Sequence, residues 1–268
     1  MKSIFYRKTL IIALATFSLG ASALVANATH SWGSYHWART NNPFTLKLGD
    51  NVSSVWDSYL ATASSDWNVS TVLHTTIVPG STDSRRCNPK SGRVEVCGRT
   101  YGNNGWLGIA SIWVSGTHIT QGTVKVNDTY FNTATYNTPG WRRMVMCQEV
   151  AHTFGLDHQD TDFNNANLGT CMDYTSDPTG TAGTNGTLSN EHANQHDYDE
   201  LGIIYSHLDS ITSLGASTFS GGNNAHVNAD DSSDLGKAIQ KDSKGRTSFY
   251  EHDLGKGEKL FTFVLWAE

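Results

Sequence analysis

Apolar residues alternate with polar ones over several short stretches of the chain, and they follow helical spacing over others. Phe44, Leu46 and Leu48 alternate with polar neighbours, which is typical of a half-buried strand. The same character predicts further strands at 72–78, 92–96, 108–114, 123–127, 247–252 and 260–266. Apolar residues three and four apart predict amphipathic helices over 53–67 and 196–208. The pattern therefore predicts an α+β fold.

A third helix is expected over 138–154, in the middle of the chain. Thr138 is a suitable N-cap, Pro139 suits the first helical position, and Gly155 can end the helix. After a polar stretch without periodicity and the helix at 196–208, residues 213–234 are rich in Ser, Gly, Asn and Asp, as in linkers. We therefore predict a main domain over 29–212, a linker over 213–234 and a small C-terminal β-hairpin appendage over 235–268.

The N-terminus has the pattern of a signal peptide. Lys2, Arg7 and Lys8 are followed by a short apolar run over 10–19 and by Ala-Asn-Ala at 26–28. The alternative is a membrane anchor, but this run is shorter than the about 20 residues that a spanning helix needs. We expect residues 1–28 to be removed and the protein to be secreted. The periplasm is the alternative destination of an exported protein.

Charge limits the partners that this protein can bind. The full chain has 19 basic and 25 acidic residues, a net charge of −6. Residues 1–28 hold three of the basic residues and no acidic one, so the mature chain would carry −9. This acidic balance argues against nucleic acid or an anionic membrane as a partner.

The chain contains four cysteines, an even number in a sequence predicted to be exported, so disulfides are expected. Cys87 and Cys97 flank a turn-rich segment, which favours pairing 87–97 and, by consequence, Cys147 with Cys171. Three connectivities are possible in principle. A zinc–cysteine site is the alternative, but the sequence has no C-x-x-C pair.

The predicted helix over 138–154 carries the residues with the clearest chemistry. Gln148 and His152 are four residues apart, so they share one face of the helix, and Glu149 lies beside that face. Gly155 can adopt a left-handed conformation that returns His158 toward the same point. Three side chains could then bind one metal and leave room for a water, which is typical of a catalytic zinc site.

This segment resembles the metzincin metallopeptidases, whose pattern is H-E-x-x-H-x-x-G-x-x-H followed by a methionine turn. Glu149, His152, Gly155 and His158 match, and Cys-Met-Asp-Tyr at 171–174 resembles the methionine turn. The resemblance implies a catalytic domain with a twisted mixed sheet, an active-site helix, the methionine turn and a C-terminal helix. It also implies a zinc endopeptidase whose substrate, an extended protein or peptide chain, pairs with the outer strand of 108–127.

The resemblance further implies roles for single residues. Glu149 would be the general base, and Tyr174 would donate a hydrogen bond to the tetrahedral intermediate. Met172 would form an apolar floor below the metal. A disulfide between Cys147 and Cys171 would join the helix to that floor.

One position departs from the family pattern, because Gln148 stands where the family has a zinc-binding histidine. Gln148 could itself bind zinc through its amide oxygen, with lower affinity than an imidazole would give. Alternatively, Tyr174 could complete the ligand set. In the third case the site holds no zinc, and the protein is a catalytically silent module that binds proteins or glycans.

Three weaker candidates remain outside this segment. Asp160, Asp162 and Asn164 have the spacing of a Ca²⁺ loop, but Asn165 and Cys171 replace its glycine and its bidentate glutamate, so a solvated polar loop is favoured. Histidines near the C-terminal helix, namely His192, His196 and His207, could form a second metal site, although surface histidines are the favoured interpretation. His118 could line the cleft or be an ordinary polar loop residue.

Overall fold

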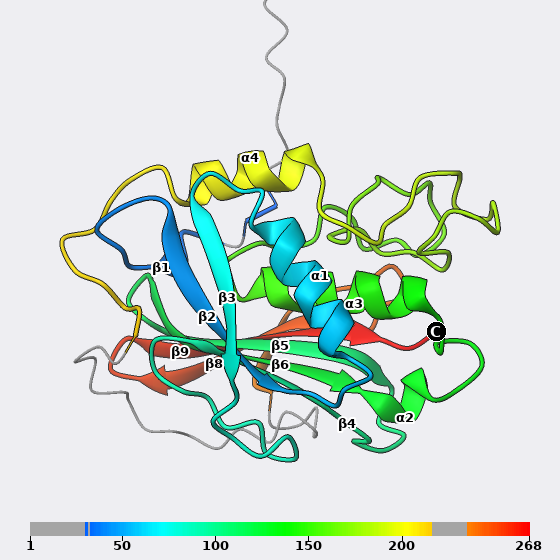
Figure 1. Ribbon diagram of the computed structural model, residues 1–268, viewed down its shortest axis with the longest axis horizontal. Coiled ribbons are helices and arrows are strands. Elements are labelled where there is room, and N and C mark those ends of the chain that lie inside the picture. Colours follow the sequence, from blue (N-terminus) through cyan, green and yellow to red (C-terminus); the bar gives the residue numbers. More distant parts are fainter. Residues whose placement is uncertain (1–29, 32, 216–234) are drawn as a thin grey trace, which may run out of the picture.

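The computed structural model describes residues 30, 31, 33–215 and 235–268 (Figure 1). The predicted signal peptide and residues 216–234 of the predicted linker lie outside the described residues. Within the described part, no helix is long and apolar enough to span a bilayer.

The described strands form one mixed sheet in the order β3-β2-β4-β6-β5-β9-β8-β7, and β1 pairs with β6 beside this path. The first half is mainly parallel and comprises β1 (His36–Trp37), β2 (Phe44–Asn51), β3 (Leu73–Pro79), β4 (Val94–Arg99) and β6 (His118–Asn127). The strand β5 (Trp106–Ser115) runs antiparallel to β6. Most of these strands were predicted, but β6 begins five residues earlier than expected and the two-residue β1 was missed.

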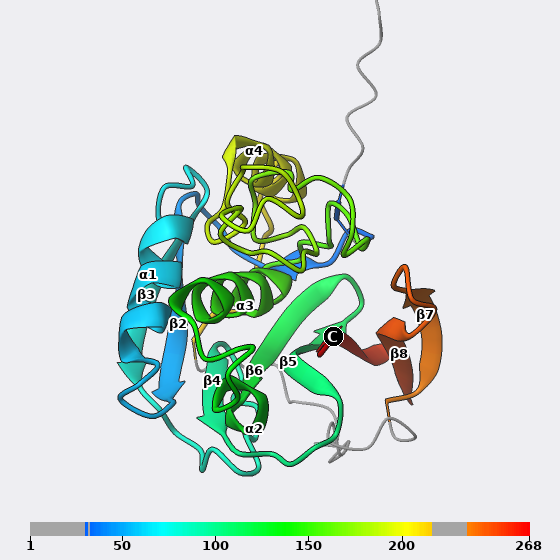
Figure 2. The ribbon, with the colours of Figure 1, turned by 90° about the vertical axis from the view of Figure 1, so that its right-hand side faces the viewer.

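Two helices, α1 (Asp57–Trp67) and α3 (Pro139–His152), pack against each other over the sheet, and α4 (Gln195–Ile204) lies beyond them (Figures 1 and 2). All three were predicted, with ends that differ by up to four residues. The single-turn helix α2 (Asp128–Phe131) was not predicted. Trp67 joins the two packed helices, because its indole N–H donates to the carbonyl of Cys147, 3.2 Å away, and its ring meets the edge of Phe154.

The C-terminal segment forms β7 (Lys237–Lys241), β8 (Thr247–Gly255) and β9 (Glu258–Trp266). The strands β8 and β9 form an antiparallel hairpin, and the left-handed residues Gly255, Lys256 and Gly257 make its turn. However, the hairpin is not a separate appendage, because β9 pairs antiparallel with β5 and so extends the main sheet (Figure 2). The strand pattern predicted the hairpin but contained no information about which sheet edge it would join. An unpaired β5 would expose a row of backbone donors and acceptors, and β9 satisfies them.

Candidate active site

The helix α3 positions three of the predicted site residues. Thr138 accepts a hydrogen bond from the backbone N–H of Trp141, 3.3 Å from its hydroxyl oxygen, and Pro139 is the first helical residue, as predicted. The helix ends at His152, two residues before the expected end. Gly155 then has φ +101°, and a Cβ at this position would lie 2.5 Å from the carbonyl oxygen of Tyr35. Only glycine fits this turn, which brings His158 back toward the helix.

The ring nitrogens of His152 and His158 converge. The Nδ1 atom of His152 donates to the carbonyl oxygen of Leu156 at 2.8 Å, so in the neutral ring Nε2 carries the lone pair. That Nε2 lies 2.9 Å from Nε2 of His158. Burial, with a smaller contribution from the charge of His158, lowers the pKa of His152 well below its usual range. The neutral form that a metal requires is therefore favoured.

Gln148 lies one helical turn before His152, on the same face of α3. Its side-chain N–H donates to the carbonyl oxygen of Cys171 at 2.8 Å, which orients the amide. Its Oε1 atom is buried and has no hydrogen-bond partner among the described residues. The amide oxygen is thus buried with its acceptor capacity unused, on the helix face that carries His152.

Glu149 is fully buried between α3 and β5. Both of its carboxylate oxygens lack a hydrogen-bond partner within the described ranges, and burial raises its pKa well above the usual range. The backbone of Gly108 on β5 touches this carboxylate closely, since a Cβ there would lie 2.5 Å from Oε1. A buried carboxyl without partners is costly unless a further group compensates it.

These orphaned atoms fit a zinc ion. Two imidazole nitrogens and one amide oxygen form a three-donor set with a carboxylate beside it, as in catalytic zinc sites that keep one position open. A dication bound there would use the unsatisfied oxygen of Gln148 and supply the positive charge that Glu149 lacks. The residues present therefore fit the metal that the sequence predicts.

Met172 and Tyr174 are buried next to these donors. Both disulfides follow the pairing favoured from the sequence, Cys87–Cys97 and Cys147–Cys171, and the second joins α3 to the segment that contains Met172. The ring of Tyr174 meets the edge of His158 with centroids 4.5 Å apart. Burial, followed by the charge of Glu149, raises the pKa of Tyr174 well above its usual range, so its hydroxyl remains a donor.

The strand β9 covers this group of side chains, which the sequence did not predict. The ring of Phe263 stacks on His152, with centroids 4.0 Å apart and an interplanar angle of 3°. The hydroxyl of Tyr174 donates to the carbonyl oxygen of Val264 at 3.5 Å. Phe261, Phe263 and Leu265 alternate along β9 and are buried in the main core, so this face of the strand packs on the candidate active site.

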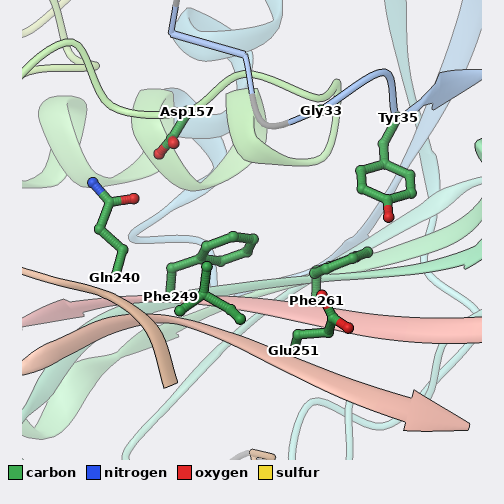
Figure 3. A pocket seen from close by; sticks show the side chains of 8 residues that line it. Gly33, Tyr35, Asp157, Gln240, Phe249, Glu251 and Phe261 are labelled. Atoms are coloured by element: carbon green, nitrogen blue, oxygen red, sulfur yellow. The ribbon is translucent and has the colours of Figure 1, made fainter. Parts of the chain in front are cut away.

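An open pocket of about 400 Å³ remains at one side of this cover (Figure 3). Gly33 and Tyr35 line it from the N-terminal segment, and Asp157, the neighbour of His158, lines the same side. The opposite wall belongs to the C-terminal strands and includes Phe249 and Glu251. The tail therefore leaves a space between itself and the main body beside the site.

The weaker candidates lie elsewhere. Asp160 and Asp162 accept hydrogen bonds from backbone N–H groups two residues later in their own loop, at 2.5 and 3.0 Å. The three C-terminal histidines do not form one cluster, because each contacts a different carboxylate or polar partner. His192 pairs with Asp66, His196 contacts Gln159, and His207 approaches His36. The Nε2 atom of His118 contacts Oδ1 of Asp209 at 3.2 Å.

Comparisons with known proteins give only distant likenesses. No protein-family model matches the sequence, and no curated protein matches it. Among solved structures, the chain is similar to high choriolytic enzyme 1, a hatching enzyme zinc-protease from the medaka fish Oryzias latipes. The identity is 12% and the TM-score 0.37, over 65% of this chain and 96% of that one. It is also similar to the structure of myroilysin, with 11% identity and a TM-score of 0.38, over 66% and 98% of the two chains. Likenesses this distant assign neither a family nor an activity, so the function is argued from the site.

Proposed function

We propose that this protein is a secreted zinc-dependent endopeptidase with a metzincin-like site. The observation that carries the proposal is the buried group of convergent donors beside an unpartnered carboxylate. The Nε2 atoms of His152 and His158 lie 2.9 Å apart, and the buried oxygens of Gln148 and Glu149 have no partner within the described part of the chain. Buried polar atoms that serve only the fold normally have hydrogen-bond partners. In a metal site, by contrast, the ligand atoms are left for the metal ion.

Gln148, His152 and His158 would hold the zinc ion. Bound there, zinc would supply a Lewis acid that polarises the scissile carbonyl and makes a water acidic near neutral pH. Gln148 replaces an imidazole with an amide oxygen, a weaker donor, but its hydrogen bond to Cys171 removes the freedom to turn away. The hydrogen bond from Nδ1 of His152 to the carbonyl oxygen of Leu156 orients the imidazole in the same way.

The chain's own residues supply the acid–base chemistry. Glu149 has both oxygens available to accept a proton from water and to deliver it to the leaving amine. Its burial keeps competing solvent away from that carboxylate. Tyr174 remains protonated and would donate a hydrogen bond to the oxygen on which negative charge develops. Met172, fully buried, would pack below the donors without binding.

An extended protein or peptide chain is the proposed substrate. The support is that β5 runs beside Glu149 and that its outer edge already accepts an antiparallel strand, β9. A substrate that paired with β5 in the same way would place its backbone over the candidate site, and strand addition of this kind is a common mode of peptide recognition.

Metal content and hydrolysis test the proposal together. We expect zinc in the purified full chain and chelator-sensitive hydrolysis of casein by a Phe263→Ala variant, in which the ring over His152 is removed. Glu149→Gln, made in the Phe263→Ala background, should abolish hydrolysis and keep the zinc, whereas the distant Glu258→Gln should change neither. The alternative of a silent binding module rests on Gln148. A folded Phe263→Ala protein with neither zinc nor hydrolysis would refute the peptidase and favour that alternative.

A further inference from the structure

A second group of side chains that could bind a metal lies between β1, the start of β6 and the segment after α4. The Nε2 atom of His36 lies 3.2 Å from Nε2 of His207 and 3.4 Å from Oδ1 of Asp209. The Nε2 atom of His118 lies 3.2 Å from the same Oδ1. The ligand atoms of His36, His207 and Asp209 thus lie within 4.8 Å of one another, and His118 contacts the same carboxylate oxygen.

The surroundings orient these donors as in a metal site. Nδ1 of His36 donates to the carbonyl oxygen of Ser34 at 2.6 Å, which leaves Nε2 with the lone pair in the neutral ring. Arg39 binds the other carboxylate oxygen of Asp209, with its backbone N–H at 3.1 Å and its guanidinium at 3.0 Å. Oδ1 of Asp209 is therefore left for the imidazoles.

The electrostatics of the group call for a cation. In the neutral ring of His36, the lone pair of Nε2 faces Nε2 of His207 at 3.2 Å and Oδ1 of Asp209 at 3.4 Å. Two lone-pair atoms at such distances repel each other unless a positive ion lies between them.

We propose that His36, His207 and Asp209 bind a divalent metal ion, with His118 as the fourth donor. Imidazole nitrogens with one carboxylate oxygen suit Zn²⁺. The ion would tie β1 and the β5–β6 turn to the segment after α4, so its role would be structural. Another group, His30, His196 and Asp197, is less suitable, because the side-chain N–H of Gln159 already donates to Nδ1 of His196 at 2.5 Å and to Oδ1 of Asp197 at 3.4 Å.

Zinc counting on the full chain tests this site. We expect His207→Ala, a change at a half-exposed side chain, to lose one zinc ion per chain relative to the wild type, as measured by mass spectrometry after dialysis. The exposed His74→Ala on β3 is the matched control and should lose none. His118→Ala should weaken binding by about 10- to 100-fold in a competition titration with Zn²⁺. Equal zinc content in the wild type and His207→Ala would overturn the proposal, and it would do so whether or not the active site binds zinc.

A different observation, the position of β9, supports a second inference. The antiparallel ladder between β5 and β9 runs from Trp106 paired with Trp266 to Ser115 paired with Glu258. In its middle, Ala110 is opposite Phe263, whose ring covers His152. The tail thus pairs with the edge of β5 and at the same time covers the ring of His152, a proposed zinc ligand.

The end of the chain is attached beside the start of α3. The hydroxyl of Tyr136 donates to the carbonyl oxygen of Glu268 at 3.1 Å, and the backbone N–H of Glu268 donates back to that hydroxyl at 2.6 Å. Backbone N–H of Ala267 also donates to the carbonyl oxygen of Gly105 at 2.7 Å. These contacts hold β9 on β5 beyond the strand itself.

We infer that residues 235–268 are an intramolecular inhibitor that occupies the substrate position, an inference that rests on the proposed peptidase function. A substrate strand and β9 need the same backbone donors and acceptors of β5, so they cannot bind together. The pocket of about 400 Å³ between the tail and the N-terminal segment is consistent with a cover that can separate from the body (Figure 3). Separation would expose the donors, Glu149 and the free edge of β5.

Cutting the full chain between body and tail tests the inhibitor. A recognition sequence for a site-specific protease is placed within 216–234, and the chain is cut without removing any part. Because tethering typically strengthens a contact by 10²–10⁴, cutting followed by dilution should raise casein hydrolysis by about 100-fold. Added synthetic peptide of residues 235–268 should reverse the gain. Phe263→Ala should activate the uncut chain, and Lys241→Ala, at an exposed tail position, should not.

A second measurement separates the inhibitor from the peptidase function. The rate at which a chelator removes active-site zinc is followed before and after cutting, in a His207→Ala background that lacks the other ion. Faster zinc removal without hydrolysis would support the cover and refute the peptidase. Unchanged zinc removal and unchanged hydrolysis after cutting, with the tail shown to be dissociated, would overturn the inhibitor.

Discussion

Substitution of Gly108 by alanine should impair hydrolysis far more than stability. Gly108 lies on β5 directly against Glu149, and an added Cβ would be 2.5 Å from Oε1 and 2.7 Å from Cγ of that side chain. Ordinary contact with a Cβ begins at 3.4 Å, so the carboxylate must retreat by about 0.9 Å, the difference between 3.4 and 2.5 Å. The end of a flexible side chain can make this movement, whereas the backbone of β5 is held by ladders on both sides.

The expected magnitudes follow from that displacement. A misplacement of about 1 Å in a catalytic group can lower the rate by about 100-fold. Extra volume in a packed core costs about 1–3 kcal/mol of unfolding free energy. The zinc content should not change, because the substitution does not reach Gln148, His152 or His158. The effect should therefore appear in kcat/KM and not in metal binding.

Initial rates of casein hydrolysis, measured on the chain cut between body and tail, provide the assay. Zinc content and urea unfolding are measured on the same samples. Gly202→Ala in α4 is the matched control, because a Cβ there meets nothing within 4 Å. A Gly108→Ala protein whose kcat/KM stays within about threefold of the wild type would refute the placement of Glu149 as general base. Loss of zinc would show that the ligands depend on β5, contrary to the geometry.

Three further predictions concern single side chains. Gln148→His should raise the zinc affinity of the active site and Gln148→Ala should lower it, because imidazole is a better zinc donor than an amide oxygen. The affinities are measured by competition with a chromophoric chelator, and equal affinities would exclude Gln148 as a ligand. Burial raises the pKa of Asp173 from 3.8 to about 6, so the folded state binds the extra proton, and stability should fall by about 1–3 kcal/mol as pH rises from 4 to 6. The free energy of unfolding of Asp173→Asn, measured with urea, should not fall over this pH range. If it falls as much as that of the wild type, the prediction is wrong. Arg142→Met should cost about 3 kcal/mol, since it removes the buried hydrogen bond to the carbonyl of Phe131, whereas the exposed Arg86→Met should cost almost nothing.

Local features of the chain could be predicted from the sequence. The N-cap at Thr138, the left-handed Gly155 and the helical spacing of Gln148 and His152 depend on interactions within a few residues. For the same reason most of the strands and the three longer helices were predicted with errors of a few residues at their ends, whereas β1 and β7 were not predicted. The two disulfides were also predicted, because a turn-rich segment separates Cys87 from Cys97 and leaves one other pair.

The contacts between distant segments could not be predicted in the same way. The group of His36, His118, His207 and Asp209 combines parts of the chain up to 173 residues apart, and no spacing rule connects them. His207 was considered with its sequence neighbours, although its partner lies on β1. Short elements such as β1 and β7 form only because a neighbouring strand provides their hydrogen bonds.

The sequence by itself determined the composition of the candidate active site, because Gln148, Glu149, His152 and His158 belong to one helix and the turn that follows it. Only the tertiary structure decided whether that site is accessible. The hydrophobic pattern of residues 260–266 required a buried face for β9 but did not specify its partner, since apolar burial and backbone pairing are non-specific in sequence. The free edge of β5 and the ring of His152 provided that partner, and so the tail of the chain lies over the residues proposed to carry out its chemistry.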